Sequence, residues 1–264
     1  MSTNPYALGT LVNAFRLLDL LAETEHELRL SDLSKQLDLP KATTYRLLAT
    51  LKEYGYVRQN EQTTGYTLGL RLWELGRRAV DRLELRSVAR PWLEQLLVDT
   101  EETVMLVILD GMLLVYVEKL DTPQPIQINP RSLGIAPLHA SASGKLFLAF
   151  GPRELWDQLV AKGLSSYTPH TITDESALER ELGLIREQGW ALSRREWREE
   201  MASIAAPVWG TQGNFVAAVT VAGPIDRFSP AREPALVEQL LHATNGISQE
   251  LGSAVQSILP KQAR

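Results

Sequence analysis

The sequence contains no cysteine. Disulfides, thiolate metal sites and cysteine nucleophiles are therefore excluded together, which is typical of proteins that work in a reducing compartment. No apolar run approaches the roughly 20 residues that span a bilayer. The stretch MSTNPYALGT at the start also lacks the basic segment and apolar core of a secretory signal. We expect a cytoplasmic protein.

Motifs that carry catalysis are missing as well. The run ASASGK, residues 140–145, resembles a phosphate-binding loop, but His139 stands where the pattern G-x-x-x-x-G-K-[ST] needs its first glycine, and Leu146 follows the lysine. No G-x-S-x-G elbow makes Ser141 a nucleophile. The four histidines are dispersed and carry no i, i+4 partner that would indicate a metal site. The sequence predicts no catalytic residue, no metal site and no cofactor.

The chain has the length and apolar content for one large or two ordinary domains, with 264 residues of which 44% are hydrophobic and 22% charged. Its formal net charge of −5 is unevenly distributed. Residues 1–80 hold ten Lys/Arg and nine Asp/Glu, whereas the remainder holds seventeen and twenty-three. A phosphate backbone senses charge within a Debye length of about 8 Å. The N-terminal part is the better candidate for nucleic-acid contact, and its modest charge predicts a need for dimerisation.

The segment LSDLSKQLDLPKATTYRLLATLKEYGY, residues 30–56, predicts two helices joined by a tight turn. Ser31 is a good N-cap for the first helix, and Pro40 suits the first position of the second. Apolar residues and one threonine recur at i, i+3, i+4 and i+7 over residues 44–51, which predicts a buried stripe. The other faces mix side chains that hold phosphates with side chains that reach base edges. The predicted DNA contacts there are Lys41, Ala42, Thr43, Tyr45, Arg46 and Thr50.

Two short β-prone runs follow, residues 56–59 and 66–68, around the polar loop NEQTTG. A late glycine between such runs is typical of a β-hairpin. Helix, turn, helix and hairpin in that order predict a winged helix-turn-helix that binds DNA. Ser31, Arg58 and Gly65 complete the predicted DNA-binding set. An ordinary helical hairpin with a solvated polar face is the alternative.

The rest of the chain predicts an α+β fold, with a sheet flanked by helices. A first helix over residues 8–23 should pack on the two helices above through an apolar stripe, which consists of Leu11, Ala14, Phe15, Leu18 and Leu21 or Ala22. Another helix should begin near Pro91, and the dipeptide Asp110-Gly111 signals a hairpin. We expect further helices at residues 70–86, 91–100, 140–150, 153–162, 175–188 and 234–256, and strands at 103–109, 112–119, 126–128, 203–209 and 215–222.

Two features of the second half allow more than one interpretation. The short side chains that begin the helix near Ala140 either leave backbone N–H groups free for an anionic effector or simply pack tightly. The mixed charge run at residues 194–200 is either a solvated face or a mobile lid over a pocket.

Stretches from nearly the whole chain share one likeness: LPKATTYRLLATLKEYGYVRQ, GYTLGLRLWELG, ARPWLEQL, EETVMLVILDG, APLHASASGK, TPHTIT, REQGW and IAAPVWGTQGNFVAAVTVAGP. In the right order, they closely resemble the isocitrate-lyase-regulator (IclR) family of bacterial transcription factors. The resemblance implies a winged helix-turn-helix at residues 1–70, a linker and dimerisation helix at 71–86, and a GAF-like effector-binding domain at 87–264. Members of this family repress or activate nearby operons, often for catabolism of small acids, as homodimers or as dimers of dimers (homotetramers).

The same resemblance implies an effector pocket in the C-terminal domain. Many members have an acidic residue near Ser193, a cysteine at Ser203 and a serine near Ala222, so this pocket should differ in polarity from those that bind small carboxylates. Trp190 is a candidate pocket wall. The implied effector-binding residues are Ile126, Ile128, Ala142, Ser143, Trp190, Ser193, Ser203, Thr220 and Ala222.

We therefore expect a sequence-specific DNA-binding transcriptional regulator, a repressor of a catabolic operon, that is controlled by a small organic or aromatic acid. Its expected partners are a double-stranded DNA operator, that effector and a second copy of the chain. Effector binding between the sheet and the helix near Ala140 should change the spacing of the two DNA-reading domains. The alternatives are a metabolite-binding, enzyme-like domain with an incidental helix-turn-helix, and a structural interaction protein whose wing is buried in a partner.

Overall fold

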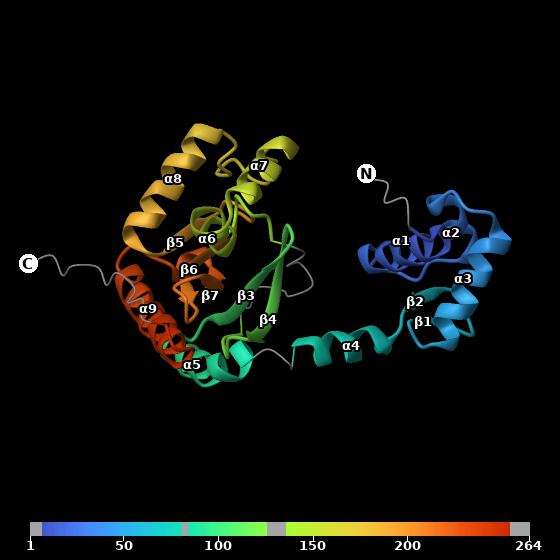
Figure 1. Ribbon diagram of the computed structural model, residues 1–264, viewed down its shortest axis with the longest axis horizontal. Helices are drawn as coiled ribbons and strands as arrows, with labels where there is room; N and C mark the ends of the chain where they lie inside the picture. Colours follow the sequence, from blue (N-terminus) through green and yellow to red (C-terminus); the bar gives the residue numbers. More distant parts are fainter. Residues whose placement is uncertain (1–6, 81–83, 126–135, 254–264) are drawn as a thin grey trace, which may run out of the picture. The chain divides into compact units, whose positions relative to one another are not determined.

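The computed structural model describes residues 7–80, 84–125 and 136–253. The chain divides into two compact units, Met1–Arg82 and Leu83–Arg264 (Figure 1). Within the described residues, no helix has both the length and the apolar character that a membrane span requires.

The N-terminal unit is a helix-turn-helix followed by a β-hairpin. Its elements are α1 (Gly9–Glu23), α2 (Leu30–Leu37), α3 (Lys41–Glu53), β1 (Val57–Gln59), β2 (Tyr66–Leu68) and α4 (Leu70–Val80). β1 and β2 pair antiparallel, with Arg58 opposite Thr67. The backbone of Leu28 pairs in addition with Tyr66, at N to O distances of 3.1 and 2.8 Å. This order of elements confirms the winged helix-turn-helix predicted from the sequence.

The turn between α2 and α3 depends on Asp38, which ends α2 in the left-handed region at φ 54°. Aspartate adopts that region more readily than most residues. Pro40 then stands immediately before α3 as its N-cap. The predicted capping role of Ser31 is wrong, because Arg29 is the N-cap and α2 begins at Leu30, so Ser31 lies inside the helix. The Asp32 carboxylate instead accepts the backbone N–H of Arg29 at 3.4 Å.

The core of this unit confirms the buried stripe of α3, where Leu48 is fully buried. The stripe predicted for α1 is confirmed in part: Leu21 is buried, and Ala14 and Leu18 pack against the same core, but Leu11 and Phe15 are 51% and 56% exposed. α1 carries apolar residues on two faces, and Leu17 and Leu21 form the face that is buried. Periodicity alone could not choose between the two faces.

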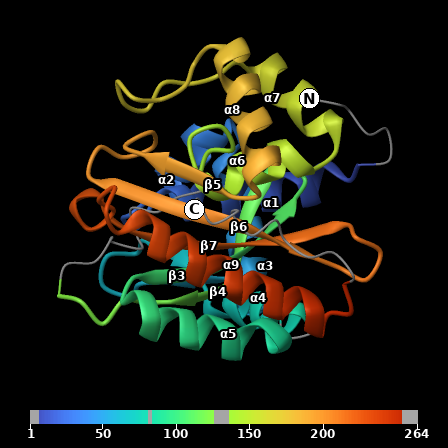
Figure 2. The ribbon, with the colours of Figure 1, turned by 90° about the vertical axis from the view of Figure 1, so that its left-hand side faces the viewer.

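The C-terminal unit is an antiparallel sheet with helices on both faces. Its elements are α5 (Glu84–Thr100), β3 (Thr103–Asp110), β4 (Leu113–Leu120), α6 (Ala142–Phe150), α7 (Arg153–Lys162), α8 (Glu175–Gln188), β5 (Ala191–Arg194), β6 (Met201–Trp209), β7 (Phe215–Pro224), the 3-10 helix η2 (Ile225–Arg227) and α9 (Glu233–Glu250). Among the described residues the strands run in the order β4-β3-β7-β6-β5. α5 and α9 cover one face of the sheet, and α6, α7 and α8 cover the other (Figure 2). These layers confirm the α+β fold class.

Some boundaries in this half differ from the predicted ones. α5 begins at Glu84 and holds Pro91 in its interior. Proline there removes one helical hydrogen bond, but Ala89 and Leu93 on either side are fully buried, so packing maintains the helix. The helix predicted at residues 70–86 is divided between α4 and α5, and residues 81–83 lie outside the described residues. The strand predicted at 126–128 also lies outside the described residues.

Candidate functional site

The outer face of α3 carries the side chains that the sequence assigns to DNA contact. All of them are exposed, whereas Thr44, Leu47 and Leu48 turn inward. These exposed residues are Lys41, Ala42, Thr43, Tyr45, Arg46 and Thr50. Cations, hydroxyls and a methyl group side by side are the chemistry that binds phosphates and reads base edges.

Ser31 and Arg58 are exposed as well, but Gly65 is buried. A Cβ atom on Gly65 would lie 2.6 Å from the Cβ of Glu27 and 2.8 Å from its Oε2. The glycine therefore allows a second segment to approach closely and does not itself present a surface to DNA. The sequence shows the glycine but not the distant glutamate that requires it.

Glu27, in the connection between α1 and α2, holds the wing loop at residues 60–65. Its Oε1 accepts a hydrogen bond from Asn60 Nδ2 at 2.8 Å, and its Oε2 accepts one from the Thr63 hydroxyl. These bonds, from Thr63 first and Asn60 second, lower the pKa of the Glu27 carboxyl. A hairpin with so few residue pairs is marginal on its own, so contacts from outside it fix its position. No local pattern in the sequence indicates the role of Glu27, because 33 and 36 positions separate it from its partners.

α3 itself carries exposed cationic side chains. Lys52 Nζ donates to Gln59 Oε1 at 2.9 Å and so joins α3 to the wing. Within the described residues, no hydrogen bond or ion pair engages the side chains of Lys41 and Arg46. These two side chains can therefore contact DNA without first breaking a contact inside the protein.

In the C-terminal unit, the sheet register gathers several predicted effector-binding residues. Ser203 on β6 lies opposite Ser193 on β5 and opposite Ala222 on β7. Thr220, two positions from Ala222, lies opposite Ala205. Paired residues in neighbouring strands share a face of the sheet. That face is the one covered by α6, since Ala205 and Ala222 belong to the same core cluster as α6.

One serine caps the start of α6, and another fastens it to this face of the sheet. Ser141 caps α6, accepting the Gly144 N–H at 3.2 Å and donating to the Pro137 carbonyl at 2.7 Å. Ser193 Oγ donates to the Ala140 carbonyl at 3.0 Å. The first turn of α6, with its backbone N–H groups, therefore starts next to the row of paired strand residues Ser193, Ser203 and Ala222.

A cavity of about 20 Å³ lies at this position. Ser193 and Ser203 line it from the strands, and Trp197 and Arg198 line it from the connection between β5 and β6. Thr220 is buried, and its Oγ1 has no hydrogen-bond partner in the part of the chain that the structure describes. Thr220 and the predicted residues Ala142, Ser143 and Ala222 are buried and stand outside the cavity lining.

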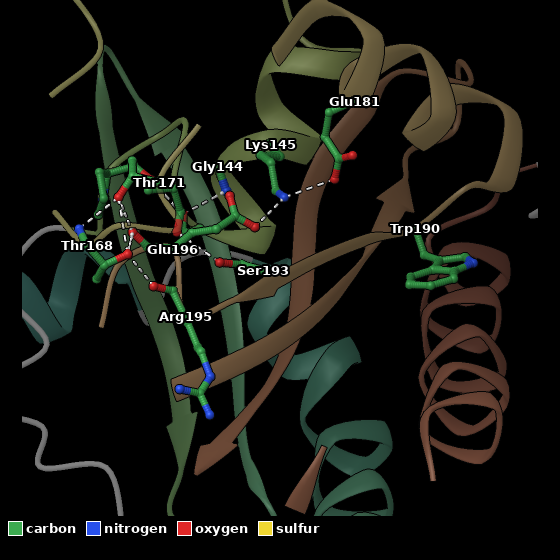
Figure 3. Close-up of polar contacts among 12 residues, drawn as sticks. Gly144, Lys145, Thr168, Thr171, Glu181, Trp190, Ser193, Arg195 and Glu196 are labelled. Atoms are coloured by element: carbon green, nitrogen blue, oxygen red, sulfur yellow. Dashed lines mark hydrogen bonds and ion pairs between the residues drawn. The ribbon is translucent and has the colours of Figure 1, made fainter. Parts of the chain in front are cut away.

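The remaining predicted residues are not part of this cluster. Figure 3 shows Trp190 pointing away from Ser193 and its neighbours. Alternation along β5 explains this placement, because positions 190 and 193 fall on opposite faces of an extended chain. Ile126 and Ile128 lie outside the described residues.

A buried ion-pair network, which no local pattern in the sequence indicates, stands beside the cavity. Lys145 is 1% exposed, and its Nζ lies 3.0 Å from Glu181 Oε1 and 2.8 Å from Glu196 Oε1 (Figure 3). Burial raises the pKa of the Glu196 carboxyl, and Lys145 opposes that shift. In the sequence this lysine stood out only as part of a failed phosphate-loop pattern. Its true partners are 36 and 51 positions away.

His139 does not assemble into a catalytic pair with Ser141. Its Nε2 is hydrogen-bonded to the Ser165 carbonyl at 2.8 Å, and burial lowers the pKa of the imidazole. The hydroxyl of Ser141 is committed to the Pro137 carbonyl. No group of three or more metal-binding side chains occurs among the described residues.

Comparison with known proteins gives one consistent result. The sequence model of the family described as bacterial transcriptional regulator IclR C-terminal matches residues 77–249, and that of the IclR helix-turn-helix domain matches residues 10–61. The chain is 35% identical over 240 residues to the HTH-type transcriptional regulator XynR of Escherichia coli, covering 90% of this chain and 95% of that protein. It is 32% identical over 253 residues to the regulator KdgR of Dickeya chrysanthemi, covering 96% and 83%. The structure of an IclR homolog from Microbacterium hydrocarbonoxydans complexed with 4-hydroxybenzoate superposes with a TM-score of 0.78 at 28% identity, covering 92% and 98%.

Proposed function

The chain belongs to the IclR family of bacterial transcriptional regulators, and from that premise we propose that it represses a catabolic operon until a small organic or aromatic acid binds its C-terminal unit. As a member of this family it is a DNA-binding regulator of transcription. The observation that carries the proposal is the outer face of α3, where an exposed set of cations and hydroxyls stands on a buried apolar stripe.

In this proposal α3 enters the major groove, and the wing lies against the adjacent backbone. Lys41 and Arg46 hold phosphates or a guanine edge, while Thr43 and Tyr45 contact bases or thymine methyl groups. Four further residues border these contacts and complete the DNA-binding set. They are Ser31, Ala42, Thr50 and Arg58. Gly65 contributes by shaping the wing.

A second copy of the chain is the proposed protein partner. Leu70 and Trp73 of α4 are 72% and 67% exposed, and α1 together with its N-cap residue exposes a stripe of four apolar residues. The stripe consists of Leu8, Leu11, Val12 and Phe15. Exposed apolar patches of this kind mark protein interfaces. Two copies also double the small positive charge of the N-terminal unit, which supports dimers, alone or in pairs, as the DNA-bound form.

The proposed division of labour follows the domain boundaries expected from the sequence. Residues 1–70 read DNA, residues 71–86 join two copies, and residues 87–264 bind the effector. The effector site is proposed between the start of α6 and the row of Ser193, Ser203 and Ala222. Backbone N–H groups at a helix start favour a carboxylate, and the unpartnered Thr220 hydroxyl offers a second polar contact.

An aromatic acid is the effector class with the best support. An IclR homolog of similar structure was solved with 4-hydroxybenzoate. Many members of the family carry an acidic residue near this position, whereas Ser193 is uncharged. The lack of that negative charge further favours an anionic ligand. An acid that binds one arrangement of the dimer more tightly than the other would change the distance between the two copies of α3.

The test is binding of the purified full chain to DNA that flanks its own gene, measured by gel shift against competitor DNA. Candidate organic acids, including 4-hydroxybenzoate, are added one at a time. We expect a specific shift that one acid relieves. A chain that binds no fragment in preference to competitor DNA would refute the proposal.

The effector site has its own test in Ser203→Trp. The indole, which is much larger than the cavity, should obstruct the site and abolish the response to the acid, while operator affinity stays at the level of the parent protein. Ser176→Trp, on the exposed start of α8, is the matched control and should keep the full response. A full acid response in Ser203→Trp would place the effector elsewhere.

A further inference from the structure

The connection between β5 and β6, residues 195–200, is the feature of the effector site that the proposed function leaves unexplained. It contributes Trp197 and Arg198 to the cavity lining. A cavity of about 20 Å³ holds a single water molecule. An organic acid therefore cannot enter unless part of the lining moves. The other lining residues belong to β5, β6 and the start of α6, so this connection is the part able to move without disrupting the sheet.

The connection is held in place by side chains from other elements. The Thr168 hydroxyl donates to the Arg195 carbonyl at 2.6 Å, and the Thr171 hydroxyl donates to the Glu196 carbonyl at 2.6 Å. Arg195 adopts a left-handed backbone at φ 59°, which is costly for a residue with a β-carbon. External contacts therefore maintain a backbone shape that the connection would not adopt readily by itself.

The charged contact in this set joins the connection to α6. Glu196 Oε1 lies 2.8 Å from Lys145 Nζ, and Lys145 stands on α6 one position after Gly144. A buried ion pair is weak evidence for stability, because desolvation offsets much of the attraction. A role in fixing one conformation explains its presence better.

The three charges are arranged unequally. Lys145 has a second partner in Glu181 at 3.0 Å, whose side chain is 30% exposed. Glu196 is fastened through one oxygen, and within the described residues its buried Oε2 has no hydrogen-bond partner. Glu196 can therefore separate from Lys145 while Lys145 keeps Glu181 as a carboxylate partner. A lysine without that second carboxylate would be left as an uncompensated buried charge, at a much greater cost.

We propose that Lys145 and Glu196 form a latch that holds residues 195–200 closed over the effector site, and that Glu181 allows the latch to open by retaining Lys145 (Figure 3). The inference rests on the proposed location of the effector site. Lys145, Glu181 and Glu196 are positioning residues in it, since none of them lines the cavity. Opening separates Glu196 from Lys145 and moves Trp197 and Arg198 away from Ser203.

The absence of cysteine allows a direct test on the full chain. Ser203→Cys places a single thiol in the cavity wall, and Ellman's reagent measures how often that wall is accessible. In the Ser203→Cys background, Glu196→Gln keeps the side-chain shape but removes the charge that holds Lys145. We expect it to raise the thiol reaction rate about five-fold or more. Glu199→Gln, an exposed neighbour, is the control and should react at the parent rate.

The variant Glu181→Gln, in the same Ser203→Cys background, distinguishes a latch from a general loosening of the structure. Without Glu181, Lys145 depends on Glu196 alone, so the thiol should react no faster than in the parent. An unchanged rate in Glu196→Gln, or acceleration in both variants, would overturn the latch. Circular dichroism confirms that each variant is folded before its rate is compared. These rates need no effector, so a failure to find an acid in the gel-shift experiment leaves them interpretable.

Discussion

The contact between Gly65 and Glu27 allows a sharp prediction about the wing. Gly65→Ala places a Cβ atom 2.6 Å from the Cβ of Glu27. Carbon atoms in contact stay about 3.5 to 4.0 Å apart, so the two segments must separate by about 1 Å. A hydrogen bond that is lengthened by that amount is lost. We expect the wing to move away from the position in which it is proposed to contact DNA.

The expected magnitude follows from the contacts that the wing makes. Loss of one or two protein–DNA hydrogen bonds, each contributing about 1 kcal/mol, should weaken operator binding roughly 5- to 30-fold. Fluorescence anisotropy with labelled operator fragment measures this change. Thr67→Ala, elsewhere on the same hairpin and partly exposed, is the control and should change affinity little.

A second substitution tests the cause. Because the overlap is with the Cβ of Glu27, Glu27→Ala keeps that atom and should not restore binding in Gly65→Ala. Glu27→Gly removes the atom and should raise the affinity of Gly65→Ala to about that of Glu27→Ala alone, since the carboxylate bonds to Asn60 and Thr63 are still missing. A double-mutant cycle measures this coupling. Equal affinity of the two double variants would refute the reasoning from close approach.

Three further predictions concern other parts of the molecule. Arg46→Ala should cost about 1 to 3 kcal/mol of operator affinity if it makes a specific contact, whereas Arg180→Ala on the exposed face of α8 should leave gel shifts unchanged. Burial raises the pKa of Tyr116 to about 12, which exceeds the value near 10 in the unfolded chain. The free energy of unfolding should therefore fall by up to about 2 kcal/mol between pH 10 and 12. Urea titrations measure this loss, which should be absent in Tyr116→Phe. Gly246→Ala would put a Cβ 2.2 Å from the Trp92 ring, and urea unfolding of the C-terminal unit should show about 1 to 3 kcal/mol of destabilisation.

Local patterns in the sequence predicted most of the N-terminal unit. Turn residues, a buried stripe and a polar loop between β-prone runs are enough to define a winged helix-turn-helix. The errors occurred where a local pattern had two solutions. α1 is apolar on two faces, so Leu11 and Phe15 were assigned to the core although they are exposed. Only packing against α2 and α3 distinguishes the two faces.

The C-terminal unit shows a different limit. The family resemblance pointed to Ser193, Ser203, Thr220 and Ala222, and the register of three strands brings these residues onto one face. Whether they bind an effector stays a prediction. Resemblance gave no signal for Lys145 and Glu196, because their role depends on a contact across 51 positions. Side-chain contacts of that range leave no periodicity to detect.

The contacts of Glu27 with the wing loop and of Glu196 with Lys145 determine how the salt dependence of operator affinity should be interpreted. Glu27 is bonded to the neutral side chains of Asn60 and Thr63, and the ion pair of Glu196 with Lys145 is buried. Added salt screens exposed ion pairs strongly, but screens buried pairs much less. Neither segment should therefore loosen as salt rises. The slope of operator affinity against salt then counts the phosphates contacted by the outer face of α3 and the wing. Lys41→Ala should reduce that slope by about one per DNA-binding unit, while Glu27→Ala should lower affinity without changing the number of phosphates contacted through α3.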